Sequence, residues 1–363
     1  MSLAQLKASV TGQVAPAALY PRWRGRILAI IGLLVLLGVT VAFATTIGSV
    51  KIPFLTTSSI LLNKLPLIDI TPTWTSALET IILDVRLPRV ILAGVVGAAL
   101  AVAGATYQGL FRNPLADPYL IGVAQGAALG AVIGFLVPIG GLAIGFGIVP
   151  LFAFVGAMLS VIFVYSIARV RKMLPVTTLI LAGVALGAFL SAIVSYLITI
   201  SAEKIHSVVF WLMGSLSLTQ WAEVKIALPA VLVGVVVILI YARSLNLMQL
   251  GEEQAQQLGV SIERFKLILL AAATLVTAAA VSFVGIIGFV GIIIPHTVRL
   301  LWGPDYRFLL PLSILVGAVF LILADIVART VLAPTEIPIG VITAFCGAPF
   351  FLYLLRRRTS VLF

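Results

Sequence analysis

The sequence predicts an all-α integral membrane protein with ten membrane-spanning helices. Its 363 residues are 62% hydrophobic and only 10% charged, whereas soluble domains average about 25% charged residues. Long apolar runs recur along the chain, and a helix needs roughly 20 apolar residues to cross a bilayer. The basic residues gather in alternate intervals between these runs, which is the pattern that orients membrane proteins.

The spans are placed by the polar and basic residues that interrupt the apolar runs. We predict them at about 27–47, 87–107, 119–137, 148–168, 175–200, 224–241, 267–284, 285–301, 309–331 and 339–355. The second begins at Leu87-Pro88 after a long polar segment, and Arg356–Arg358 stop the tenth. The eighth contains Gly and Pro and is predicted to be broken or tilted, while the half-apolar interval 201–223 predicts an interfacial or re-entrant helix. The domain plan is therefore a cytoplasmic segment 1–26, one permease domain 27–355 and a cytoplasmic tail 356–363.

The net charge of +11 is a signal of topology rather than of nucleic-acid binding. If the N-terminus is cytoplasmic, 16 of the 23 Lys and Arg residues lie on the cytoplasmic side and seven on the other. Positive residues favour the cytoplasmic side, so both termini are predicted to be cytoplasmic. Spans 2–5 and 7–10 each begin with a helix rich in small residues and end with a Pro-initiated helix. This pattern indicates an inverted repeat, a plan common among transporters.

The cytoplasmic interval Asn246–Lys266 is polar and lies between two long apolar runs. Its Gln and Glu residues alternate with Leu250, Ala255 and Leu258. Gly251 and Gly259 suit helix ends, so the interval predicts a short amphipathic helix in two pieces. It either presents a rigid surface to a soluble partner or forms a solvated loop helix, and the residues alone favour neither.

The sequence lacks the patterns that would indicate catalysis. It has no Gly-Lys dipeptide and hence no P-loop, and no HExxH motif or plausible Ser/His/Asp set. A single cysteine, Cys346, excludes an internal disulfide and a cysteine-rich metal site. His206 and His296 could ligate haem, but a structural or interfacial role is favoured for each. We therefore predict no catalytic residue, no metal site and no cofactor bound by this chain.

Charged residues on the outer side are few and need a reason. Asp325, an acid well inside a span, is expected to pair with Arg329 one helical turn away. Arg86, Arg89 and Arg329 lie on the outer side against the positive-inside trend. They either bind headgroups and local acids such as Asp84, or form a basic rim that docks an acidic protein.

The chain resembles the FecCD-type permeases of bacterial ABC importers for iron–siderophores, haem and cobalamin. The similarity covers nearly everything from Arg86 to the C-terminus. The matching segments are RLPR (Arg86–Arg89), GATYQGLFRNPLADPYLIGVAQGA (Gly104–Ala127), LILAGVALGAFLSA (Leu179–Ala192), FWLMGSL (Phe210–Leu216), LGEEQAQQLGV (Leu250–Val260), GFVGIIIPHTVRL (Gly288–Leu300), LLPLSILVGAVFLILADIVART (Leu309–Thr330) and EIPIGVITAFCGAPFFLYLL (Glu336–Leu355).

The resemblance implies a ten-span subunit in a bacterial cytoplasmic membrane, paired with a second copy of itself. It further implies two ABC ATPase subunits that carry ATP and Mg, and a periplasmic or lipid-anchored binding protein. ATP-driven rocking of the two copies would move a metal chelate along their interface. The substrate pathway is expected to bind weakly, with Phe210, Met213 and Ser191 as candidate lining residues and ordinary packing as the alternative.

The resemblance also implies roles for particular residues. The segment 246–263 is similar to the coupling helices that contact the ATPase. Arg86, Arg89 and Arg329 match the arginines that dock the binding protein, and the family's cytoplasmic gate falls at Asn113 and Leu115 and at Thr177 and Thr178. The coupling residues implied are Leu250, Gly251, Glu252, Glu253, Ala255, Leu258 and Gly259.

The cargo and two other classes of function remain as alternatives. An iron–siderophore or haem is favoured because such permeases are numerous, and cobalamin is the alternative within the family. An ion-coupled secondary transporter would need several acids inside the spans, and Asp325 alone gives it little support. An integral membrane enzyme would need a catalytic cluster, which the sequence lacks.

Overall fold

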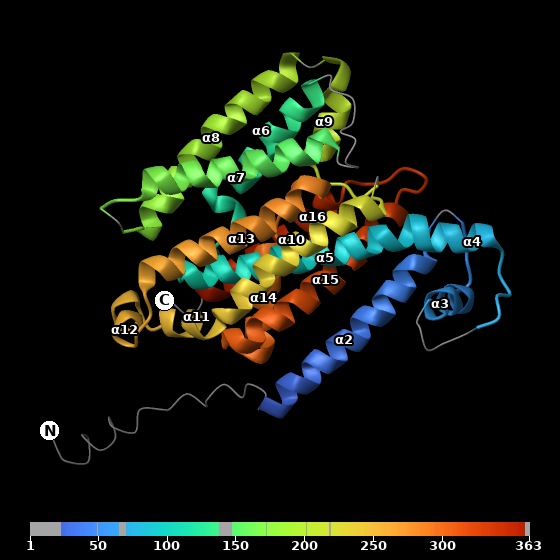
Figure 1. Ribbon diagram of the computed structural model, residues 1–363, viewed down its shortest axis with the longest axis horizontal. Helices are drawn as coiled ribbons and strands as arrows, with labels where there is room; N and C mark the ends of the chain where they lie inside the picture. Colours follow the sequence, from blue (N-terminus) through green and yellow to red (C-terminus); the bar gives the residue numbers. More distant parts are fainter. Residues whose placement is uncertain are drawn as a thin grey trace.

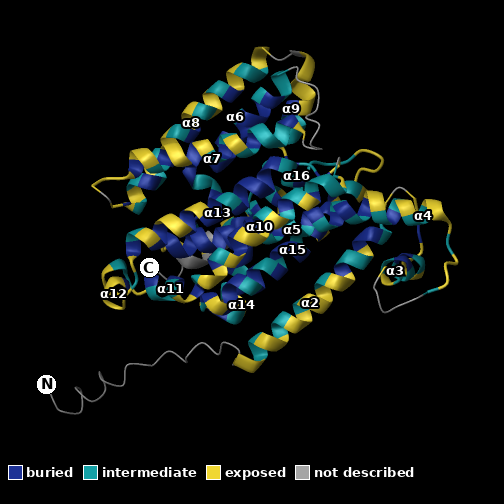
Figure 2. Ribbon diagram, in the orientation of Figure 1, coloured by how far each residue is buried: buried dark blue, intermediate teal, exposed yellow. Residues whose placement is uncertain are grey.

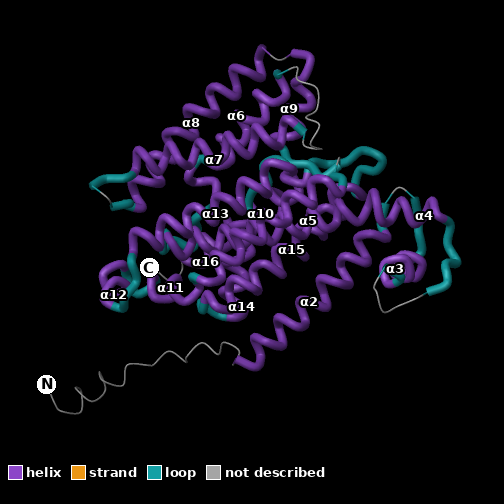
Figure 3. Tube along the Cα trace, viewed as in Figure 1, coloured by secondary structure: helices purple, strands orange, loops and turns teal. Residues whose placement is uncertain are grey.

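The computed structural model describes residues 23–48, 50–64, 70–137, 147–171, 173–200, 202–217 and 219–359. The predicted N-terminal segment 1–26 thus lies outside the described residues as far as residue 22, and the predicted tail 356–363 lies outside them from residue 360. The described part consists of helices joined by loops and turns, with one isolated bridge between Val170 and Met173 (Figure 3).

Each of the ten predicted spans contains an apolar helix. In the described residues seven helices are long and apolar enough to cross a membrane, and three more are apolar but shorter. The long helices are α2 (Trp23–Thr46), α5 (Leu87–Leu110, continuous with the helix from Ser76), α7 (Ile148–Ala168), α8 (Val176–Ile200), α10 (Trp221–Ile240), α13 (Ile262–Val284) and α15 (Tyr306–Thr330). The shorter ones are α6 (Val123–Leu136), α14 (Val290–Trp302) and α16 (Ile339–Thr359). The chain is therefore an all-helical, multi-pass membrane protein.

Small helices occupy the intervals between the apolar ones. They are α3 (Phe54–Leu62), α4 (Ser76–Thr80), η1 (Ile81–Arg86), η2 (Pro118–Ile121), η3 (Ala202–Lys204), α9 (Ile205–Leu212), α11 (Ala242–Met248) and α12 (Glu252–Gln257). The apolar helix predicted within 201–223 is α9. It ends at Leu212, and a turn then brings the Ser215 N–H to the carbonyl of Val284 at 2.8 Å, which joins this interval to the end of α13.

Two helices extend beyond the predicted span ends. The helix of the second span begins before Leu87-Pro88, because it runs continuously from Ser76 to Leu110. Its π-helical turn η1 carries the N–H of Leu87 to the carbonyl of Ile82, and this wider turn accommodates Pro88 without breaking the helix. The helix of the tenth span likewise continues past Arg356 to Thr359, the end of α16. Arg is a good helix former, so a helix can extend past the apolar part of its sequence.

The helices form one bundle with distinct ends (Figure 1). Helices α6 to α9 pack together along one side, α5, α10, α13, α14 and α15 form the centre, and α2 lies against α15 on the opposite side. Helices α11 and α12 lie at one end of the bundle, whereas α3 and α4 lie at the other. The two ends therefore carry different polar segments.

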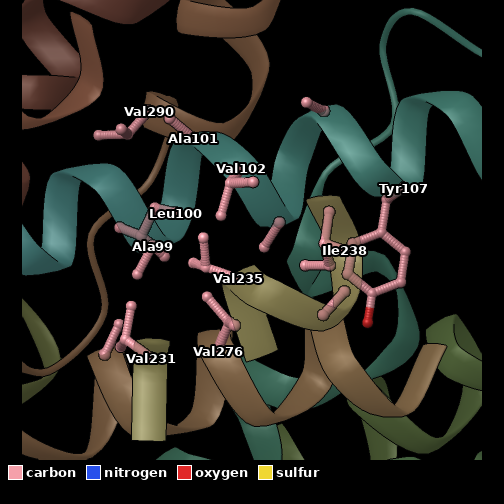
Figure 4. Packing of buried hydrophobic residues seen from close by; sticks show 14 of the residues in the cluster. Ala99, Leu100, Ala101, Val102, Tyr107, Val231, Val235, Ile238, Val276 and Val290 are labelled. Carbon is pink, nitrogen blue, oxygen red and sulfur yellow. The ribbon is translucent and has the colours of Figure 1, made fainter. Parts of the chain in front are cut away.

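Helix α5 is the centre of the core. Ala99, Leu100, Ala101, Val102 and Tyr107 of α5 lie among side chains of three neighbouring helices (Figure 4). Those neighbours are Val231, Val235 and Ile238 of α10, Val276 of α13 and Val290 of α14. Its buried face includes many Ala and Gly residues, and small residues allow helices to approach closely where lipid supplies no hydrophobic drive to pack them.

Two short helices, α6 and α14, each follow a segment of irregular backbone, and these two segments meet inside the bundle. The first break runs from Phe111 to Gly122 and precedes α6, and the second runs from Gly285 to Phe289 and precedes α14. The Tyr119 hydroxyl of the first lies 3.0 Å from the carbonyl of Ile287 in the second and donates to it. Irregular backbone is tolerated at membrane depth only where protein or a cavity surrounds it. This contact gives the two broken segments such surroundings.

Close helix contact at Gly104 leads to a stability prediction. A Cβ on Gly104 would overlap the backbone of Gly291 on α14, whereas a Cβ on Gly32 of α2 would meet nothing within 4 Å. Gly104→Ala is expected to destabilise the fold by about 1–3 kcal/mol through overpacking. Gly32→Ala is expected to be neutral or to stabilise α2 slightly. Thermal unfolding of both variants in detergent measures the difference, and equal midpoints would contradict the close packing.

Candidate coupling and docking sites

The predicted coupling segment consists of two short helices separated by a glycine. Helix α11 ends at Met248, and α12 begins at Glu252. Gly251 between them has φ 127°, and Gly259 after α12 has φ 90°. Both values lie in the left-handed region that favours glycine. The two glycines thus set the turns before and after α12, as the sequence predicts.

One side of α12 is packed against the chain, and most of its other side chains are exposed. Ala255 is fully buried, and its N–H bonds to the carbonyl of Gly251 at 2.9 Å. Leu250 and Leu258 are 59% and 58% exposed, and Glu253 is exposed as well. Figure 2 shows α12 as a largely exposed helix at the end of the bundle. Leu250, Leu258 and Glu253 thus form a surface that is open to a partner at this end of the bundle.

The segment is anchored to the core by amide side chains. Gln249 of the turn after α11 donates to the carbonyl of Gly109 at the end of α5, at 3.1 Å. Asn246 donates to Asp305 at 2.7 Å and accepts from the N–H of Tyr306 at 2.9 Å. Burial opposes ionisation of Asp305, but hydrogen bonds from Arg307 and Asn246 outweigh it and lower the pKa of its carboxyl to about 2. The Asp305 carboxylate, which accepts the hydrogen bond from Asn246, therefore stays ionised at any physiological pH.

Two of the three predicted docking arginines bind the end of α2. Arg86 donates to the carbonyls of Thr45 and Thr46 at 3.1 and 2.7 Å, and also to that of Val50. Arg329 donates to the carbonyls of Ala44 and Ile47 at 2.7 and 2.8 Å. The last carbonyls of a helix lack partners within it and attract cations. Arg86 and Arg329 thus satisfy the C-terminal end of α2 and fasten this helix to α5 and α15.

The third arginine holds two carboxylates. Arg89 contacts Asp325 at 2.8 Å and Glu336 at 2.8 Å. Asp325 is 1% exposed, and its oxygen also lies 3.4 Å from Arg329 Nε. The expected pairing of Asp325 with Arg329 is therefore present, but Arg89 makes the closer contacts. Asp84, the other acid considered as a partner, is exposed.

These contacts leave little of the three arginines at the surface. Arg86 is 6% exposed, and the side chains of Arg329 and Arg89 are 7% and 13% exposed. The three arginines form a mostly buried cluster with two carboxylates, because helix-end carbonyls and acids close to them compete for guanidinium groups. We call this set the arginine cluster: Arg86, Arg89, Arg329, Asp325 and Glu336. A docking role for its arginines stays a prediction.

The predicted gate residues lie in two separate segments. Asn113 follows the end of α5, and its side chain accepts from the N–H of Leu115 at 2.9 Å. Thr177 and Thr178 lie in the first turn of α8 and are exposed and half-buried, respectively. Both gate segments lie close to the coupling segment. Gln249 binds the carbonyl of Gly109, shortly before Asn113, and Lys266 binds the carbonyl of Leu174, shortly before Thr177.

Sequence reasoning missed two residues that the structure places at these sites. Glu336 joins the arginine cluster, and Lys266, 3% exposed, bonds to Glu252 of α12. A signal for Lys266 exists in the sequence, since it shares a helical face with Ile262, Phe265 and Leu269, all buried. A lysine on an apolar face indicates a buried ion pair.

Neither histidine lies in a cluster suited to a metal. Within the described residues no group of three or more His, Cys, Asp or Glu side chains could hold an ion. His206 is exposed and stacks on Phe210 with ring centroids 6.2 Å apart. His296 is 6% exposed and meets the edge of Phe350. The structure thus gives both rings aromatic neighbours.

The bundle of long apolar helices, with the polar helix α12 exposed at one end, is that of a multi-pass membrane protein. The sequence profile of the FecCD transport family matches residues 33–357, so the chain belongs to this family. It is therefore a non-catalytic permease subunit of an ABC importer, a class that works with an ATPase and a binding protein.

Individual relatives agree with this assignment. The cobalamin import permease BtuC of Halobacterium salinarum is 50% identical over 77% of this chain and 74% of its own length. The hemin transport permease HmuU of Yersinia pestis is 41% identical over 76% of this chain and 83% of its own. A solved ABC transporter in an inward-facing conformation, assigned to the metal-chelate type, is 34% identical with a TM-score of 0.75, covering 90% of this chain and 98% of that one.

Proposed function

We propose that this chain is one of two identical permease subunits of an ABC importer that moves a metal chelate into the cytoplasm. The family match over residues 33–357 carries the proposal. In the proposed complex, two ATPase subunits bind α11 and α12, and a periplasmic or lipid-anchored binding protein docks at the opposite end. ATP binding and hydrolysis then switch the pair of permeases between outward-open and inward-open states.

The proposal includes ten spans with both termini in the cytoplasm and an inverted repeat. The opposite placement of α12 and α4 in the bundle supports this topology (Figure 1). The repeat is supported by a shared plan, in which a long buried helix is followed by irregular backbone and then by a short helix. Helices α5 and α6 follow this plan in the first half, and α13 and α14 follow it in the second. The membrane is proposed to be the cytoplasmic membrane of a prokaryote, because the relatives are bacterial and archaeal.

A second copy is proposed to cover the apolar faces of α8 and α16, with the substrate pathway between the copies. Phe189 and Tyr196 of α8 are 63% and 66% exposed, and Phe345 of α16 is 75% exposed. A cavity of about 600 Å³ lies beside α16. Its lining is apolar and includes Met213, Phe289, Val341 and Phe345. Such a wall supports weak binding of a large cargo, because it offers few fixed polar partners.

The docking role of the arginine cluster gives a testable prediction. Reversing the charge of Arg86 or Arg329 to Glu is expected to raise the binding-protein concentration needed for half-maximal stimulation of ATP hydrolysis by about tenfold or more, with hydrolysis in its absence retained. Lys225→Glu, an equal charge reversal at the exposed start of α10, is the matched control. Normal stimulation in both arginine variants would remove the docking role and leave the binding of the α2 end as their only one.

The cargo is proposed to be an iron chelate, haem or a corrinoid. An iron–siderophore or haem agrees with the hemin relative, whereas the cobalamin relative shares 50% identity and makes cobalamin the first compound to test. Titrating the cognate binding protein with cyanocobalamin, haemin and ferric citrate, and following tryptophan fluorescence, separates these cargoes. Saturable quenching by one compound only would identify its class.

An ion-coupled secondary transporter is not favoured by the structure. Its one candidate coupling acid within the predicted spans, Asp325, is already held by Arg89 and Arg329, so it is not poised to exchange an ion.

Affinity purification of the tagged permease from its own host tests the proposed ABC importer directly. Recovery of an ABC ATPase subunit in amounts similar to the permease is expected, and a permease that carries no ATPase would contradict it.

A further inference from the structure

The side chain of Lys266 lies where three parts of the cytoplasmic end meet. It is on the second turn of α13 and is 3% exposed. Its Nζ lies 2.7 Å from Glu252 of α12 and donates to the carbonyl of Leu174 at 3.2 Å. Glu263 of the same helix lies 3.7 Å away. A buried ammonium group is stable only when it is paired and hydrogen-bonded, so these partners hold it in place.

Both backbone polar groups of Leu174 are bound by side chains of α13. Its carbonyl accepts from Lys266, and its N–H donates to Glu263 at 2.9 Å. Leu174 itself is buried and stands two residues before the start of α8. Losing a partner leaves a buried backbone group unsatisfied, which is costly. These two side chains therefore tie the segment before α8 to α13.

We propose that Lys266 transmits the movement of α12 to the start of α8. The inference rests on the proposed function, in which the ATPase moves α12. Glu252 is on α12, so a displacement of this helix pulls on Lys266 through a short charge-assisted hydrogen bond. Lys266 in turn pulls on Leu174, and Thr177 and Thr178 lie on the first turn of the helix that follows. Lys266 is a positioning residue, because it acts on the predicted gate through the backbone and touches no cargo.

The contacts of Lys266 with Glu252 and Leu174 are well placed to transmit a movement of α12. The Lys266 ammonium group is shielded from water, so its electrostatic contacts are weakened less by solvent than those of a surface pair. Glu252 is 44% exposed, which leaves α12 free to be moved by a partner. Helix α8 is a continuous helix of 25 residues, so a shift of its first turn is carried along its length.

The test follows two spin labels in the permease pair, assembled with ATPase subunits free of cysteine. The label sites are Gln257→Cys on α12 and Leu181→Cys on α8, both exposed. Cys346→Ser removes the chain's single native cysteine. Distances between equivalent labels in the two copies are measured by pulsed electron paramagnetic resonance, without nucleotide and after trapping with ATP and vanadate. In the wild-type background, trapping is expected to shift both distances.

Lys266→Met is expected to keep the shift at Gln257 and lose the shift at Leu181, since the methionine fills a similar volume but cannot bind Glu252 or Leu174. Glu252→Ala changes a half-exposed residue and is also expected to keep the shift at Gln257 and lose the shift at Leu181. This variant tests the proposal if Lys266→Met fails to assemble. Arg264→Met removes a charge from an exposed position of the same helix and is expected to keep both shifts.

Three results would count against the proposal. A shift at Leu181 that persists in Lys266→Met, or in Glu252→Ala where the former does not assemble, would show that Lys266 only stabilises the fold. Loss of the Leu181 shift in Arg264→Met as well would show that any charge change at this end of α13 has the effect. Absence of both shifts in the wild-type background would instead remove the proposed ATP coupling, and this inference with it.

Discussion

Replacing Arg89 by leucine is expected to lower the free energy of unfolding by about 3–5 kcal/mol, the range found when one partner of a buried ion pair is removed. Asp325 is 1% exposed, and Arg89 contacts it at 2.8 Å. Without Arg89, only Arg329 Nε at 3.4 Å remains to compensate this buried carboxylate. Glu336, on the segment before α16, also loses its partner. Unfolding of the isolated permease in detergent, followed by SDS or heat, measures the loss.

The matched control is an ion pair of the same type at the surface. Arg307 contacts Asp305 at 2.8 Å, and its side chain is 45% exposed. Arg307→Leu is expected to cost about 0–1 kcal/mol, because water screens an exposed pair. The double variant Arg89→Leu with Asp325→Asn is expected to be more stable than Arg89→Leu alone, since the uncompensated charge is gone. Equal losses at Arg89 and Arg307 would contradict a buried role for Arg89.

Breaking α12 is expected to give the largest functional effect. Ala255→Pro removes the N–H that bonds to the carbonyl of Gly251 and costs a helix interior about 3 kcal/mol. Glu252→Arg places a second positive charge beside Lys266, where a carboxylate now lies 2.7 Å away. Both changes are expected to reduce the amount of cargo moved per ATP hydrolysed by about 5–150-fold, the range of ordinary coupling free energies.

The measurement compares uptake with ATP hydrolysis in the same reconstituted complex. Ala255→Ser keeps the backbone donor and is expected to retain most of the uptake. Full transport in both Ala255→Pro and Glu252→Arg would refute a role for α12 in coupling. A loss of ATPase binding in these variants would agree with the role, since the exposed leucines beside α12 are the proposed contact.

Hydropathy predicted the apolar helices well and their ends less well. Helix α7 runs from Ile148 to Ala168, as predicted, because its apolar run is bounded by glycine before it and arginine after it. The helix that leads into α5 begins at Ser76, before the predicted span, since hydropathy cannot detect a helix that continues through polar residues with a π turn. Bilayer length limits the apolar part of a helix and not the helix itself.

The sequence predicts candidate site residues, but it does not predict which side chains they contact. Local spacing suggested Arg329 as the partner of Asp325, whereas the closest contact comes from Arg89, 236 residues away. The apolar face that Lys266 shares with Ile262 and Leu269 indicates its burial, but not that Glu252 and Leu174 are its partners. Ion pairs between distant segments are set by tertiary packing, which a single sequence does not reveal.

The measurement that tests the central claim most directly is uptake into proteoliposomes that contain the permease, the ATPase and the binding protein. Cyanocobalamin, haemin and ferric citrate serve as probes, and each is tested separately with the cognate binding protein. Accumulation of one probe is expected only with ATP on the ATPase side, and vanadate is expected to stop it. Uptake driven by an ion gradient without ATP or the ATPase would contradict the account.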